Sequence, residues 1–151
     1  MASFQKDIAK IQAKLQGVLG QKAWGVARGM GSFVTIEFGQ PVPPLRTNEK
    51  SHGEWHLWLY GCAWHLEQAE KILTASEDEY AKIEAAISCI EGQVLQSFEV
   101  ITPALDAILT FEGDIVLRLF AVSTEEMDSW MLFTSEKVIT VEPAGLWSYE
   151  A

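Results

Sequence analysis

The sequence predicts a single α+β domain, in which two helices pack on a largely antiparallel sheet or on a partly open barrel. The chain has 151 residues, which suits one domain with one substantial core. Two stretches show the 3.6-residue apolar period of a helix, and most of the rest alternates apolar and polar residues in short segments. Similar blocks recur in the two halves. We therefore expect the domain 1–151 to consist of two pseudo-repeated helix-plus-meander halves, residues 3–75 and 76–150.

The clearest sign of the repeat is a pair of segments, Trp64–Thr74 and Trp130–Thr140, whose first residues lie 66 positions apart. A Trp, a Leu two positions later, a Glu-Lys pair and a final Thr occupy the same places in both segments. We therefore expect Trp64 and Trp130 to be equivalent anchors in the core.

In the first half, the helical period and the alternation predict one helix and two strands, at residues 3–17, 22–28 and 33–38. The helix is expected because Ile8, Ile11 and Leu15 form one apolar stripe. Residues 39–53 contain three closely spaced prolines, which a central strand does not tolerate. A polar loop is expected there, either a functional loop or the mobile tip of a hairpin.

Residues 54–60 and 63–68 are expected to form a hairpin around Gly61-Cys62, because Gly at the first central position favours a type II′ turn. That register gives three cross-strand pairs: Tyr60 with Ala63, Trp58 with His65, and His56 with Glu67. One face is then the core face, with Trp55, Leu57, Leu59, Trp64 and Leu66. The other face carries Glu54, His56, Trp58, Tyr60, His65 and Glu67. It is either an exposed aromatic binding patch or a face that a helix covers.

The second half is expected to begin with a capped helix. Ser76 and Glu79 have the spacing of a capping box, and Gly92 supplies the helix end. The strands of this half are expected at residues 94–101, 105–112, 115–122, 129–135 and 137–142, whereas a short strand at 71–75 ends the first half. The aromatic residues of the tail, 145–149, are expected to dock on the core.

The net charge of −10 is unevenly distributed. Residues 1–76 carry a net charge of +2, and residues 77–151 carry −12. A strongly acidic surface repels phosphate, so we expect no nucleic-acid binding. No apolar run approaches the length of a membrane span, and the N-terminus lacks the pattern of a secretion signal, so we expect a cytoplasmic protein without membrane attachment. The acidic half provides either solubility alone or attraction for a basic protein partner.

Few residues have the pattern of a chemical site. His52, Glu54, His56 and His65 are the only metal-like cluster, because Glu54 and His56 share a strand face that His65 would join across the hairpin. Cys62 with His56 or His65 would be a nucleophile pair, but no oxyanion hole is recognisable. Glu37, Glu54 and Glu67 can be read as acid–base groups or as carboxylates facing water. Cys62 and Cys89 are expected to be reduced, with at least one buried.

Several aromatic runs resemble those of uncharacterised bacterial α+β proteins of this size, some of which look like toxin-immunity proteins. The runs are Gly53–Tyr60 with Ala63-Trp64, Trp130–Phe133, and Val141-Glu142-Pro143 leading to Trp147–Glu150. The resemblance covers about residues 20–150 and includes no catalytic residue. It implies a cytoplasmic, non-enzymatic protein that blocks a toxin by surface complementarity.

Together these patterns favour a non-enzymatic, immunity-like interaction protein without a cofactor, which binds a basic protein partner. The residues we expect at the binding site are His56, Trp58, Tyr60, His65 and Arg46. The alternative is a small-molecule- or metal-binding protein that uses the His/Trp hairpin and the proline-rich loop. A third reading is a homodimer in which the near-neutral half of one chain meets the acidic half of another.

Overall fold

The structure is a computed structural model that describes residues 2–30, 33–43 and 51–151, apart from the side chains of residues 2–6. The helices are α1 (Ala2–Lys14) and α2 (Tyr80–Ile87), with 3-10 turns η1 (Gln16–Val18), η2 (Ser88–Ile90) and η3 (Pro143–Gly145). The strands are β1 (Ala23–Arg28), β2 (Val34–Val42), β3 (His52–Leu59), β4 (Cys62–Gln68), β5 (Lys71–Ala75), β6 (Leu95–Ile101), β7 (Asp106–Phe111), β8 (Ile115–Ala121), β9 (Trp130–Phe133), β10 (Val138–Val141) and β11 (Trp147–Glu150).

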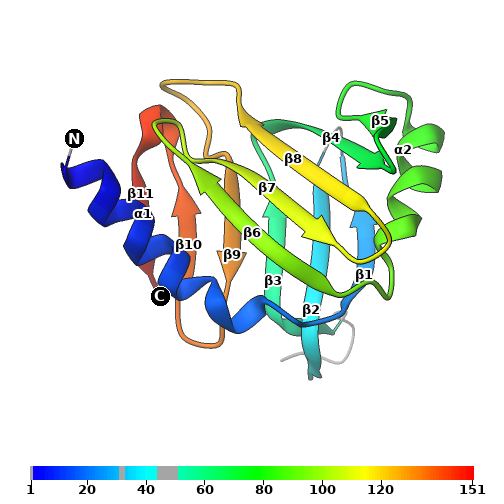
Figure 1. Ribbon diagram of the computed structural model, residues 1–151, viewed down its shortest axis with the longest axis horizontal. Coiled ribbons are helices and arrows are strands. Elements are labelled where there is room, and N and C mark those ends of the chain that lie inside the picture. Colours follow the sequence, from blue (N-terminus) through cyan, green and yellow to red (C-terminus); the bar gives the residue numbers. More distant parts are fainter. Residues whose placement is uncertain (1, 31–32, 44–50) are drawn as a thin grey trace.

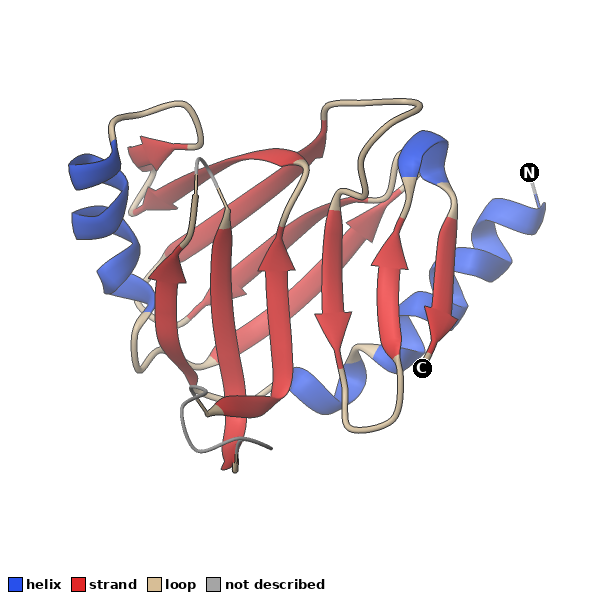
Figure 2. Cartoon of the chain, turned by 180° about the vertical axis from the view of Figure 1, so that it is seen from behind, coloured by secondary structure: helices blue, strands red, loops and turns tan. Residues whose placement is uncertain are grey.

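The strands form two antiparallel sheets that stack face to face, with the strands of one sheet crossing those of the other obliquely (Figures 1 and 2). One sheet has six strands in the order β1-β2-β3-β9-β10-β11, and the other has five in the order β5-β4-β8-β7-β6. The predicted α+β class with antiparallel pairing is confirmed. The sheets do not close into a barrel.

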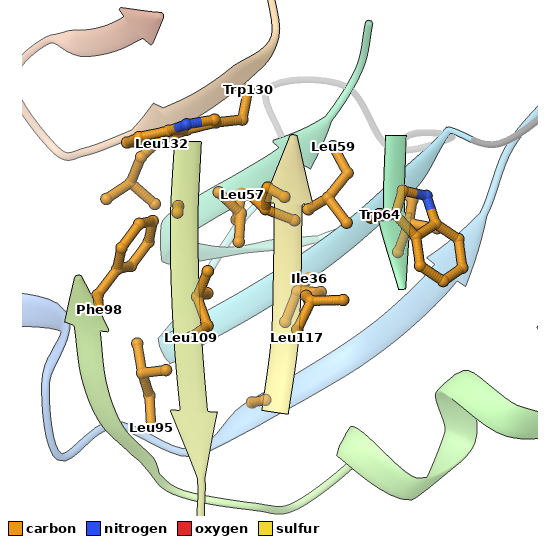
Figure 3. Packing of buried hydrophobic residues seen from close by; sticks show 14 of the residues in the cluster. Ile36, Leu57, Leu59, Trp64, Leu95, Phe98, Leu109, Leu117, Trp130 and Leu132 are labelled. Carbon is orange, nitrogen blue, oxygen red and sulfur yellow. The ribbon is translucent and has the colours of Figure 1, made fainter. Parts of the chain in front are cut away.

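The core lies between the two sheets and follows from the alternation of the strands. Ile36 and Leu57 point inward from the six-stranded sheet, and Leu109 and Leu117 face them from the five-stranded sheet (Figure 3). The largest fully buried side chains include Trp64 and Trp130, one from each sheet. Each buried Leu or Ile side chain contributes about 1.5–3 kcal/mol relative to an exposed one, so this layer dominates the stability.

The two helices cover the open sides of the sandwich. Helix α1 packs along the edge strand β6, where the Gln12 side chain donates to the Phe98 carbonyl at 2.9 Å and accepts from the Val100 amide at 2.8 Å. Helix α2 packs against β5 and β1, which are edge strands of different sheets (Figure 1). Neither helix, as far as the chain is described, is long and apolar enough to cross a membrane.

Each half of the chain contributes to both sheets. The meander β1-β2-β3 is completed by β9, β10 and β11, and the meander β6-β7-β8 is completed by β4 and β5. Reciprocal backbone bonds join the starts of the two meanders: the Gly20 amide donates to Leu95 at 2.8 Å, and the Gly92 amide donates to Ala23 at 2.7 Å. The pseudo-repeat is nevertheless not confirmed: the described residues of the first half include no strand equivalent to β11.

The predicted hairpin around Gly61 is wrong. β3 pairs with β2 and β9, whereas β4 pairs with β5 and β8, so the chain passes from one sheet to the other at Gly61. The Gly61 amide donates to the carbonyls of Asp128 and Ser129 at 3.0 and 3.1 Å. A Cβ at Gly61 would lie 2.5 Å from the Asp128 oxygen, so this glycine permits a close backbone approach and does not form a type II′ turn.

The predicted loop at residues 39–53 is shorter than expected. β2 continues through Pro41 and Val42 after a bulge, and these residues pair with Gly53 and His52 of β3. β1 begins opposite Phe38 and does not extend to Pro41, so Pro41 needs no amide for a ladder on that side. Residues 44–50, and with them the predicted site residue Arg46, lie outside the described residues.

The predicted capping box is also wrong. The Ser76 hydroxyl accepts from the Trp64 amide at 3.2 Å, and Glu79, the residue before α2, makes no side-chain capping hydrogen bond. Asp78 closes the turn instead, with its carboxylate accepting from the Ala75 amide at 3.0 Å and from the Thr74 hydroxyl at 2.9 Å. Two smaller predictions are confirmed, because Cys62 and Cys89 are free with Cys62 buried, and the tail packs its aromatic residues on the core.

Candidate functional site

The structure separates the residues that the sequence placed on one binding face. His56 and Trp58 lie on the outer side of β3, and Tyr60 follows that strand. His65 lies on β4 between the buried residues Trp64 and Leu66, so it faces outward from the five-stranded sheet on the opposite side of the sandwich. The candidate site is therefore the outer face of the six-stranded sheet, without His65.

A row of four side chains crosses this face. Trp24, Glu37, His56 and Phe133 occupy opposing positions on β1, β2, β3 and β9. Glu37 is 6% exposed, although it lies on the side of β2 that faces away from the core. Flanking aromatic rings thus bury a carboxylate that the sequence pattern places toward water.

The contacts of Glu37 are polar but leave its charge unbalanced. Its Oε1 accepts from the Gly53 amide at 2.8 Å, and its Oε2 lies 2.5 Å from His56 Nδ1. The contact with Nδ1 lacks hydrogen-bond geometry. Within the described residues, no lysine or arginine nitrogen lies within 4.0 Å of this carboxylate.

The protonation of His56 follows from its other neighbour. The Trp58 indole Nε1 donates a short hydrogen bond to His56 Nε2. Because an indole N–H is only a donor, Nε2 must carry a lone pair, and the single ring proton is on Nδ1. In this arrangement His56 is neutral and cannot neutralise Glu37.

A pocket of about 500 Å³ opens above Glu37, and we name it the carboxylate pocket. Its wall is shaped by a bulge in β1, where Gly25 has φ +59° and a Cβ would lie 3.0 Å from Glu37 Cγ. The Glu91 carboxylate holds the bulge by accepting from the Gly25 and Val26 amides at 3.0 Å each. The lining residues are Trp24, Gly25, Val26, Ala27, Thr35, Glu37, Ser51, His52 and His56.

The aromatic residues continue from this pocket along β2 and β3. The Trp58 ring lies 4.8 Å from the Phe133 ring and 5.3 Å from Phe33, and Phe33 is 5.9 Å from Tyr60. The described contacts of Trp58 come from neighbouring strands and from Phe33, and they leave its side chain half-buried. Trp58 is thus neither fully exposed nor covered by a helix of the described chain, because other aromatic rings cover it in part.

A second pocket, of about 470 Å³, lies where these aromatic residues end at Phe33 and Tyr60, and we name it the apolar pocket. Its lining residues are Gly29, Met30, Phe33, Tyr60 and Met127. Met30 is 92% exposed, and Tyr60 and Met127 are each more than 40% exposed. Met127 belongs to the β8–β9 connection, whose other residues include the acidic side chains Glu125, Glu126 and Asp128.

The outer face of the five-stranded sheet has different chemistry. Glu67 Oε2 lies 2.5 Å from Arg118 Nε and 2.8 Å from His65 Nε2. The hydrogen bond from Arg118 lowers the pKa of the Glu67 carboxyl below its ordinary value. Desolvation opposes this shift, and the hydrogen bond with His65 adds to it. This carboxylate is thus already paired by the chain itself.

The other predicted chemistry is not assembled. The predicted metal ligands are only partly brought together. The rings of His52 and His56 lie 5.7 Å apart. His65 is on the other sheet, and the exposed Glu54 accepts from the Gln40 amide at 2.8 Å. The described residues contain no group of three or more His, Cys, Asp or Glu that could hold a metal. Burial raises the pKa of the Cys62 thiol to about 12, so Cys62 is not a thiolate nucleophile at neutral pH.

The sequence placed His56, Trp58 and Tyr60 on the face opposite the core, and they stay predicted site residues, but it did not connect them with the other groups of this face. The sequence predicts that Glu37 is either an acid–base group or a carboxylate facing water, and it does not reveal the burial of Glu37, because the opposing residues Trp24 and His56 come from neighbouring strands. Met30 and Met127 are distant in sequence, and no local pattern connects them. Comparison of this chain with protein families, curated proteins and solved structures finds no match.

Proposed function

We propose that the protein is a cytoplasmic, non-enzymatic interaction protein of the immunity-like kind, which binds a basic protein partner on the outer face of the six-stranded sheet. The observation that carries the proposal is the exposed apolar pocket of Met30, Tyr60 and Met127 beside the acidic residues of the β8–β9 connection. Apolar side chains with a polar rim are typical of protein-binding sites.

Two physical effects support this partner class. Tyr60 and the methionines supply apolar contact area, and Met adapts its shape to a partner. Glu125 and Glu126 next to Met127 attract a positively charged surface and speed its encounter. The net charge of −12 on residues 77–151 extends this field.

The direct test is a pull-down from the organism that encodes the protein, followed by affinity measurement with each captured protein. We expect a basic partner whose binding weakens with salt. In the variant carrying Met30→Ala and Tyr60→Ala we expect a loss of about 30-fold or more, because truncation of anchor residues costs about 2 kcal/mol or more. Glu125→Lys with Glu126→Lys should slow association.

Matched controls lie on other surfaces. Ile72→Ala removes a side chain that is 69% exposed on β5, and Glu84→Lys reverses an exposed charge on α2. Both should leave affinity unchanged. A partner that binds the pocket variants and the control variants equally well would contradict the proposal.

A second candidate is a small-molecule- or metal-binding protein, which the carboxylate pocket with His52 and His56 favours. Metal analysis of the purified protein tests it, with His56→Ala and His65→Ala compared. His65 is on the opposite face, so it serves as a matched control. Stoichiometric metal that is lost only in His56→Ala would replace our first proposal. Light scattering tests whether the partner is instead a second copy of this chain.

A further inference from the structure

We infer that the carboxylate pocket binds one guanidinium group, the side chain of an arginine on the basic partner, with Glu37 as its counter-ion. This inference rests on the proposed function, because the partner supplies the arginine. It adds a second, chemically specific contact at the other end of the same face from the apolar pocket.

The first argument is charge. A buried carboxylate is costly unless a cation or several hydrogen bonds compensate it. Glu37 is 6% exposed, and the one well-formed hydrogen bond that it makes with the described residues comes from the Gly53 amide. His56 is held neutral by the Trp58 indole. A carboxylate has about four acceptor sites, so acceptor capacity remains for an incoming donor.

The second argument is the shape and chemistry of the walls. Trp24 and His56 flank Glu37 on the neighbouring strands, and Gly25 leaves the space beside the carboxylate open. A guanidinium is planar and weakly hydrated, stacks on aromatic faces, and binds carboxylates through paired donors. An ammonium group satisfies these walls less well because it is compact and strongly hydrated.

The third argument is position. Phe33 borders the apolar pocket and Glu37 the carboxylate pocket, and Glu37 follows Phe33 by four positions, with three residues of β2 between them. At about 3.3 Å per residue, the two pockets lie roughly 13 Å apart along the strand. Thr35 and Trp58 lie between them as opposing residues of β2 and β3. One partner surface can therefore place an apolar anchor and an arginine on this face at the same time.

The test is a titration of the full chain with N-acetyl-arginine methylamide. Binding is monitored through the NMR signal of the Trp58 indole N–H. That proton bonds to His56 beside the pocket, and Trp58→Phe assigns its signal. We expect saturable binding in the millimolar range, so the titration runs to about 50 mM. The citrulline analogue, which has the same shape without the charge, should bind at least tenfold more weakly, and the lysine analogue should also bind more weakly.

Two variants test the pocket in different ways. Glu37→Gln keeps the size of the side chain and an acceptor for Gly53, and should weaken arginine binding at least tenfold. Ala27→Phe fills the pocket from an exposed position on β1 and leaves Glu37 in place, with the same expected loss. Glu99→Gln removes an exposed carboxylate on β6 and should change nothing.

The outcomes separate this inference from the proposed function. Equal binding by Glu37→Gln and the native chain, equal binding of citrulline, or no saturable shift by about 50 mM overturns the guanidinium pocket. Loss of arginine binding in both pocket variants supports it. The Met30→Ala, Tyr60→Ala variant should still bind the arginine probe. The arginine titration can therefore succeed even if the pull-down finds no basic partner, so the two experiments fail independently.

Discussion

Each outer face of the sandwich carries a Glu–His pair, but the two pairs are built differently. On the five-stranded sheet, Arg118 pairs with Glu67, and the side chains are partly open to solvent. On the six-stranded sheet, aromatic residues bury Glu37, and no described lysine or arginine lies within 4.0 Å. The chain thus neutralises one carboxylate itself and leaves the other without a cation in its described part.

This difference separates two uses of one residue pair. A surface ion pair such as Glu67–Arg118 adds little free energy, about 0–1 kcal/mol, because water already solvates both charges. A buried carboxylate costs more, and that cost falls when an external cation arrives. The first pair supports the sheet, and the second has capacity for a ligand.

The largest expected effect comes from truncating the two carboxylates. Glu37→Ala leaves the buried Gly53 amide without its acceptor, so we expect a loss of about 1–3 kcal/mol in the free energy of unfolding. Glu67→Ala should cost about 0–1 kcal/mol. Urea denaturation measures both. Similar losses in the two variants would remove the distinction between the faces.

The next effect concerns the histidines. His56→Ala takes the acceptor from the half-buried Trp58 indole, and we expect a cost of about 1–2 kcal/mol. His65→Ala removes a contact at a partly exposed surface pair and should cost less than about 0.5 kcal/mol. Thermal and urea unfolding of the two variants, side by side, provide the measurement. A larger loss of stability for His65→Ala than for His56→Ala would contradict the view that the six-stranded sheet carries the more buried pair.

A designed arginine should make the two faces alike. Ala27 on β1 lies diagonally opposite Glu37 on β2. Arg118 on β8 lies diagonally opposite Glu67 on β4 in the same way. Ala27→Arg should therefore stabilise the chain by about 0.5–1 kcal/mol and abolish binding of the arginine probe. In a Glu37→Gln background the gain should vanish. A gain that persists there would show that Ala27→Arg acts through some other contact.

The smallest effect is a pH dependence on the five-stranded sheet. Arg118→Met removes the main cause of the lowered pKa of Glu67, so that pKa should rise toward its ordinary value. A lowered folded-state pKa gives stability that is present above the unfolded pKa and is lost as pH falls through the folded pKa. At pH 7 the free energy of unfolding of the native chain should exceed that of Arg118→Met by about 0.2–1 kcal/mol. This difference should disappear in acid. NMR titration of the Glu67 carboxyl gives the pKa directly.

Much of the fold could be predicted, because the alternation of residues such as Ile36, Leu57 and Leu66 reflects one buried face per strand. The partners of the strands could not be predicted in the same way. Gly61 looks like a turn residue in the sequence, but the chain there contacts Asp128 and Ser129, which are far away in sequence. Local turn chemistry therefore predicted a hairpin where long-range backbone contacts direct the chain into the other sheet.

The candidate site shows the same limit. The strand period placed His56 and Trp58 correctly on the outer face, and both remain predicted rather than tested site residues. The period also placed Glu37 outward, but the burial of Glu37 comes from Trp24 and His56 on adjacent strands. The sequence separates Glu37 from Trp24 by thirteen positions and gives no sign of their contact.

The exchange of strands between the halves has a consequence for how this chain is made. During synthesis the first 75 residues emerge with β4 and β5 complete, but the strands that pair with β4 on its other side and extend β3 are still to come. Such long-range pairing is slow, and unpaired strand edges attract other chains. A nascent chain stalled near Ser76 therefore exposes two sheet edges, on β3 and β4, that later strands cover in the full chain, and a separately expressed fragment 76–151 is the natural molecule to cover them.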